Sequence, residues 1–119
     1  MVISLEDFTV ESNATVRAAM LKITANHYRV VVVLDGKKVV GTVSDGDIRR
    51  AFLKDVLPIA PVEQIMNINC ETTTETDRER LKEIILSKQV TVLPVVNNEN
   101  ELIDIVVAYE PFATQDSVE

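Results

Sequence analysis

The residues best suited to chemistry form one run from Gly41 to Asp47, with the sequence Gly-Thr-Val-Ser-Asp-Gly-Asp. The run joins an apolar, strand-like stretch to a helix-like one. At such a junction the N–H groups of the first helical turn converge with the positive end of the helix dipole, and together they can hold a phosphate. The Ser44 hydroxyl would add a hydrogen bond, and the Asp47 carboxylate matches the two vicinal hydroxyls of a ribose. The junction is therefore a candidate nucleotide site.

The same junction has a structural interpretation. A serine followed three residues later by an acidic residue resembles a capping box, and capped helix termini are far commoner than nucleotide sites. A hydrolase is disfavoured, because Gly41, Ser44 and Gly46 miss the Gly-x-Ser-x-Gly spacing by one residue and His27 is the single histidine. Residues 45–47 are too few for a calcium loop. Capping and ligand binding both stay open on spacing alone.

Hydrophobic periodicity predicts the elements that position this junction. In the first half it predicts an arm or edge strand over residues 1–10, a helix over 14–27 capped by Asn13, strands over 29–34 and 38–43, and a helix near 48–55. In the second half it predicts a helical turn over 62–66, a short strand over 72–74, a helix over 77–88 capped by Thr76, and strands over 90–96 and 102–107. Pro94 interrupts one of these strands, which places it at an unpaired edge or a bulge.

An internal repeat links the two halves. The order helix, strand, turn, strand occurs over residues 14–43 and again over 77–107, and matching Val40 to Ile103 gives an offset of 63. The 19 Val and 10 Ile residues favour strands. Each half alone has too little structure to bury its apolar face, so the halves are expected to share one core. The predicted fold is α/β, as one module of two repeats, residues 1–57 and 58–119, each a small sheet with two helices.

Composition excludes several functions. The net charge is −7, from 12 Lys+Arg and 19 Asp+Glu, without a basic stripe, so nucleic acid is not an expected partner. The longest apolar run has five residues, which predicts no membrane span, and the first ten residues lack the basic start of a signal peptide. One histidine and one cysteine, Cys70, leave no zinc ligand set and no internal disulfide, which fits a reducing cytoplasm.

The two repeats, together with Gly-Thr-Val-Ser-Asp-Gly-Asp-Ile-Arg-Arg at residues 41–50, resemble a tandem cystathionine-β-synthase-type (CBS) domain pair. Residues 61–67 resemble the linker that opens second repeats in that family. The Ser-Asp-Gly-Asp-Ile-Arg-Arg form, followed by Ala-Phe-Leu, most resembles pairs attached to sugar-nucleotidyltransferases, and next those attached to sugar-phosphate isomerases. The resemblance implies two intertwined repeats related by a pseudo-twofold, in a regulatory module that is not an enzyme.

The resemblance also implies roles for individual residues. In the family the Ser/Thr of the signature contacts phosphate and the Asp holds ribose, and these roles fall on Ser44 and Asp47. Thr42 departs mildly from the hydrophobic residue of the signature. The other candidate ligand-binding residues are Asp45 and Gly46 in the signature and, matching the strands whose backbone contacts the base, Thr9, Val10, Tyr28 and Val30.

The second repeat departs from the signature. The 63-residue offset puts Asp104, Val107 and Glu110 at the glycine, serine and aspartate positions. A valine cannot hydrogen-bond phosphate, and an added carboxylate would repel it. At most one nucleotide-like ligand per chain is therefore expected.

These features together predict a ligand sensor. The ligand would be AMP, ADP or ATP, S-adenosylmethionine or a sugar nucleotide, with no required cofactor and no metal. Binding would shift the arrangement of the repeats and bias an attached sugar-nucleotidyltransferase domain. The resemblance further implies a homodimer formed through helix faces. The alternative is a structural dimerisation module in which Ser44 and Asp47 only cap a helix.

Overall fold

The structure, a computed structural model, describes residues 4–108. The first half contains β1 (Thr9–Glu11), α1 (Val16–Asn26), β2 (Val30–Asp35), β3 (Lys38–Ser44) and α2 (Asp45–Leu53). The second half contains α3 (Arg78–Lys88), β4 (Val92–Val96) and β5 (Leu102–Val107), and short 3-10 helices span Leu5–Phe8 and Val62–Gln64. The predicted α/β fold is confirmed. A second helix of the second repeat would fall outside the described residues.

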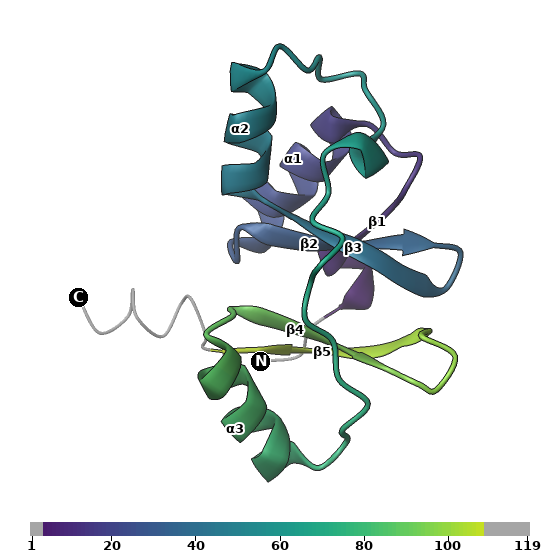
Figure 1. Cartoon of the computed structure of the whole chain (residues 1–119), viewed down its shortest axis with the longest axis vertical. Helices are drawn as coiled ribbons and strands as arrows, with labels where there is room; N and C mark the ends of the chain where they lie inside the picture. Colours follow the sequence, from purple (N-terminus) through teal and green to yellow (C-terminus); the bar gives the residue numbers. More distant parts are fainter. Residues whose placement is uncertain (1–3, 109–119) are drawn as a thin grey trace, which may run out of the picture.

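Within residues 4–108, two sheets and three α-helices stack in four layers (Figure 1). The first sheet has the order β1-β2-β3, with β1 parallel and β3 antiparallel to β2, and β4 and β5 form an antiparallel pair. Helices α1 and α2 cover the outer face of the first sheet, and α3 covers the outer face of the second. In the described part of the chain, no helix has the length and apolar character needed to cross a membrane.

The sheets face each other across a shared core. Alternation along β2 sends Val31 and Val33 into the cluster beneath α1 and α2, and sends Val32 toward the second sheet. All three side chains are fully buried, as expected for a strand covered on both faces. The core between the sheets contains residues of both halves: Phe8, Tyr28, Val32, Val39, Val92, Val96 and Ile105. Each sheet therefore buries its inner face only against the other.

The hairpins of the two halves match residue by residue. Val30 pairs with Ser44 across the first hairpin, and Val92 pairs with Val107 across the second. The offset is therefore 62 residues at the first strand and 63 at the second, because the second turn is one residue longer. Instead of the predicted strand over 72–74, Thr73 makes a single parallel bridge. The repeat bounds 1–57 and 58–119 stay a prediction.

Two helix caps differ from the sequence expectation. Thr15 caps α1 by accepting a hydrogen bond from the Ala18 N–H (3.0 Å), whereas Asn13 lies in a preceding turn. In α3 the cap is Asp77, because the Glu75 carboxylate holds the preceding turn by accepting the Thr76 N–H (3.0 Å). Both helices begin one or two residues later than predicted. Both errors arise because several neighbouring side chains in each turn are suitable caps.

Gly41 allows the two halves to be joined across β3. The connecting segment, residues 66–71, crosses β3, where Thr42 and Asn67 exchange backbone hydrogen bonds of 3.1 and 2.7 Å. A Cβ atom at position 41 would lie 2.9 Å from the Asn67 carbonyl oxygen and 2.9 Å from the Met66 sulfur. A side chain at this position would require the connecting segment to shift away from β3.

We expect Gly41→Ala to lower the free energy of unfolding by about 1–3 kcal/mol, because the new methyl group meets backbone that cannot move freely. Denaturant titration of the 119-residue chain measures this change. Gly46→Ala is the matched control, since a Cβ there meets only the end of the flexible Arg50 side chain, 3.2 Å away. A helical alanine should leave stability unchanged or raise it by up to about 1 kcal/mol. An equal loss of unfolding free energy in both variants would contradict the close packing of the connecting segment on Gly41.

Candidate ligand-binding cleft

A cleft of about 880 Å³ lies where the two repeats meet. Residues 27–30, between α1 and β2, and residues 89–92, between α3 and β4, contribute equivalent junctions to its walls. His27 and Gln89 both end their helices in the left-handed conformation, with φ of 67° and 57°. The start of α2 and the connecting segment complete the cleft. A ligand here would contact both repeats at once.

The structure brings six of the nine sequence-predicted site residues to this cleft: Tyr28, Val30, Thr42, Ser44, Asp45 and Gly46. Three others lie elsewhere. Asp47 lines a neighbouring hollow of about 220 Å³ beside Arg50, Thr9 pairs with Val32 at the sheet edge, and Val10 is buried beneath α1. Whether any of the nine contacts a ligand stays a prediction.

Eleven lining residues were not predicted: His27, Arg29, Arg49, Asn67, Asn69, Cys70, Glu71, Gln89, Val90, Thr91 and Val92. The repeat offset contained a signal for some of them. Because residues 89–92 are the equivalents of 27–30, a wall placed at one junction implies a wall at the other. Residues of the connecting segment carry no such signal, since only the crossing at Gly41 places them.

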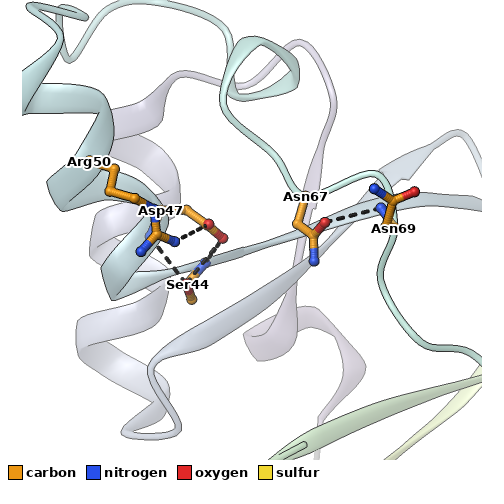
Figure 2. A network of polar contacts seen from close by, with 5 residues as sticks. All are labelled: Ser44, Asp47, Arg50, Asn67 and Asn69. Atoms are coloured by element: carbon orange, nitrogen blue, oxygen red, sulfur yellow. Dashed lines mark hydrogen bonds and ion pairs between the residues drawn. The ribbon is translucent and has the colours of Figure 1, made fainter.

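Ser44 and Asp47 form a complete capping box (Figure 2). The Ser44 Oγ accepts the Asp47 N–H (3.2 Å), while Asp47 Oδ2 accepts both the Ser44 N–H (2.9 Å) and the Ser44 hydroxyl (3.0 Å). Asp47 Oδ1 accepts a bond from the Arg50 guanidinium at 2.7 Å. The structural interpretation of this pair is therefore present in the fold. A ribose could reach the carboxylate only by replacing some of these bonds.

Backbone contacts fix the α1–β2 junction to the start of α2. The Asp45 N–H donates to the Arg29 carbonyl at 3.1 Å, and Arg29 has φ of 67°, a conformation that strains a residue with a Cβ. Buried Asn26 holds the same junction, because its Oδ1 accepts the Tyr28 N–H (2.8 Å) and its Nδ2 donates to the Val30 carbonyl (3.1 Å). The Arg29 side chain is thereby placed at the cleft.

The charged side chains of the cleft are balanced. Arg29 and Arg49 line it together with Asp45 and Glu71, and all four are exposed. Among residues 4–108, neither arginine makes an ion pair, whereas Glu71 pairs with Lys88 at 3.4 Å. Two unpaired guanidinium groups beside a helix N-terminus favour an anionic ligand.

Cys70 supplies a built-in probe of the cleft, as the chain's single cysteine. Partial burial raises the pKa of its thiol above the ordinary value, and the neighbouring Glu71 carboxylate adds to the rise against a backbone hydrogen bond that lowers it. The thiol is therefore protonated at neutral pH.

Within the described part of the chain, no group of three or more His, Cys, Asp or Glu side chains could hold a metal ion.

The equivalent positions of the second repeat lack the groups of the first that suit a phosphate. Val107 stands where the first repeat has Ser44, and Thr91 stands where it has Arg29. Asp104 lies on β5, where it pairs with Val95 of β4, and it occupies the position that Gly41 has in the first repeat. Glu110, predicted at the Asp47 position, lies outside the described residues.

Comparison with known proteins agrees with this architecture. Residues 2–54 match the family model of the CBS domain. The chain is 30% identical over 95 residues to arabinose 5-phosphate isomerase GutQ from Escherichia coli (strain K12), covering 78% of this chain and 30% of GutQ. The chain thus spans less than a third of the length of this curated relative.

Two solved structures share the fold. A CBS domain pair/ACT domain protein from Thermotoga maritima superposes with a TM-score of 0.71 at 19% identity, covering 98% of this chain and 93% of that one. The CBS domain protein PAE2072 from Pyrobaculum aerophilum, solved in complex with AMP, gives 0.67 at 19% identity and covers 98% of both chains. The matched first repeat and the shared fold support a tandem CBS domain pair.

We expect Cys70 to react slowly with iodoacetamide at pH 8, because its raised pKa leaves less thiolate than a free cysteine has. The rate should climb only as the pH passes above the ordinary range of a thiol. Mass spectrometry of the intact chain over a pH series measures it. Denatured chain is the control, and a native rate equal to the denatured rate would contradict the burial of Cys70.

Proposed function

We propose that this chain is a regulatory module that senses an adenosine nucleotide bound in the cleft between its repeats. The observation that carries the proposal is the cleft itself, which joins Ser44 at the start of α2 to equivalent junctions of both repeats. The structural neighbour PAE2072 binds AMP, which supports an adenosine nucleotide over S-adenosylmethionine or a sugar nucleotide.

The proposed ligand lies along the cleft with its phosphate at the start of α2. There the helix dipole and the two unpaired arginines favour negative charge. The Ser44 hydroxyl can donate to the phosphate once it gives up its hydrogen bond to Asp47 Oδ2. Val30 offers apolar surface for the base, whereas the Tyr28 side chain is buried in the core between the sheets. Asp47 contacts ribose in this proposal only after it gives up part of its capping box or its Arg50 ion pair.

Ligand binding would couple the repeats, because the cleft walls belong to both. A ligand that binds one arrangement of the repeats more tightly shifts the population toward it. In this proposal, the shift changes the activity of an attached catalytic domain, which is a sugar-phosphate isomerase or a sugar-nucleotidyltransferase. The relation to GutQ favours the isomerase, which ranked second in the sequence-based expectation.

A structural dimerisation module is the second candidate, and the complete capping box favours it, since Ser44 and Asp47 already satisfy each other.

We propose a homodimer in either case. The end of α2 and the segment after it expose Leu53, Leu57 and Ile59, with exposed fractions of 79, 62 and 77%. Such clustered apolar surface is typical of an interface.

We expect AMP, at 100 times its Kd, to raise Tm by about 10 °C, since a ligand that binds only the folded state adds about 2.7 kcal/mol. A thermal-shift panel of adenosine nucleotides, S-adenosylmethionine and sugar nucleotides measures this. Ser44→Ala and Asp47→Ala should lower the Tm of the free chain and abolish the AMP shift.

Asp77→Ala is the matched control, because it removes the cap of α3, far from the cleft lining. It should lower Tm by a similar amount, for a cap worth about 1 kcal/mol, and keep the full AMP shift. Protection of Cys70 from alkylation by AMP would place the ligand in the cleft. If no compound shifts Tm at millimolar concentration, the dimerisation module is the correct function.

For the homodimer, we expect light scattering to give twice the chain mass, and Leu53→Asp to give the mass of one chain. The charge would be buried without a partner in the interface. Ile68→Asp serves as control, because Ile68 is comparably exposed (71%) but lies on the connecting segment. A monomeric parent would rule out the proposed dimer.

A further inference from the structure

The two arginines of the cleft match the charge of one phosphate group, and its two carboxylates oppose a longer chain of phosphates. Its fully charged lining residues in the described part of the chain are Arg29, Arg49, Asp45 and Glu71. The phosphate of a nucleoside monophosphate carries about two negative charges at pH 8, equal to the charge of the two arginines. Further phosphates would find no unpaired cation among these four residues, and would meet two carboxylates.

Asp45 lies beside the proposed phosphate position. It is the first residue of α2 and directly follows Ser44, and its N–H is held by the Arg29 carbonyl at 3.1 Å. The backbone of Asp45 is therefore held in place, and its exposed carboxylate belongs to the same helix end that favours an anion. One phosphate gains from the helix dipole, and from the Ser44 hydroxyl if that group leaves Asp47, but each added negative charge increases the repulsion from the Asp45 carboxylate.

Glu71 adds a second carboxylate from the connecting segment. Its only ion pair among the described residues is with Lys88 at 3.4 Å, and both side chains are nearly half exposed (44 and 47%), so water and salt weaken the neutralisation. The net charge of −7 acts in the same direction. Both carboxylates thus favour a ligand of low charge.

We propose that Asp45 and Glu71 determine specificity by selecting a nucleoside monophosphate over a di- or triphosphate. This inference rests on the proposed function. The expected order of affinity is AMP, then ADP, then ATP, with AMP at least about tenfold tighter than ATP in low salt. Two arginines that neutralise one phosphate, facing two acids, are sufficient for a difference of this size.

Isothermal titration at pH 8 tests the proposal, with AMP, ADP and ATP in buffer containing EDTA so that no divalent cation neutralises the phosphates. Asp45→Asn and Glu71→Gln should each reduce the ratio of the ATP Kd to the AMP Kd about threefold. Glu83→Gln makes the same charge change on the exposed face of α3, outside the cleft lining, and should leave the ratio unchanged. High salt should reduce the ratio in the parent chain.

Glu71→Gln also frees Lys88, so the double variant Glu71→Gln/Lys88→Gln separates the two effects. A ratio that stays reduced in the double variant assigns the effect to the Glu71 carboxylate, and a ratio that returns to the parent value overturns that assignment. ATP binding as tightly as AMP to the parent overturns the selectivity while the proposed function stands. If no nucleotide binds, the proposed function fails and this inference fails with it.

Discussion

The packing of the two sheets against each other is the interaction on which the rest of the structure depends. In the described residues the second sheet has only two strands, and an isolated two-stranded hairpin is marginal in water. At the hairpin end the sheets are also joined by polar bonds, since Asn100 donates to the Val39 carbonyl (2.7 Å) and the Leu102 N–H to the Lys37 carbonyl (2.9 Å). The cleft lies at the opposite end of the strands, so the sheets are joined at one end and a ligand would join them at the other.

The start of α2 combines two demands on the same atoms. Ser44 and Asp47 satisfy each other as a cap, and caps of this kind contribute about 1 kcal/mol to stability. Under the proposed function, a bound phosphate and ribose would replace those bonds with bonds of their own. In the absence of a ligand, the cap keeps the polar groups of Ser44 and Asp47 hydrogen-bonded to each other. Capping and binding are therefore compatible uses of one helix terminus.

Much of this architecture was predictable because it follows from local pattern. The apolar run of β2, the two hairpins and the repeat were all predicted, and the 62- and 63-residue offsets differ only by a turn residue. The caps of α1 and α3 were misplaced, since several side chains in each turn are suitable. The connecting segment was not predictable as a cleft wall, because its place depends on the absence of a side chain at Gly41. Thr9 and Val10 were assigned by resemblance, and the structure places them away from the cleft.

The two repeats share a backbone plan but not a surface chemistry, and this asymmetry determines what one cleft can do. Where the first repeat has Ser44 and Arg29, the second has Val107 and Thr91, so the polar groups suited to a phosphate come from one side. The second repeat still supplies residues 89–92 as the facing wall. A ligand held by the anion-binding groups of the first repeat would thus contact the second mainly through uncharged side chains, among them Gln89, Thr91 and Val92. Such a contact depends on the distance between the repeats, and so the occupied cleft would favour one arrangement of the two sheets over the others.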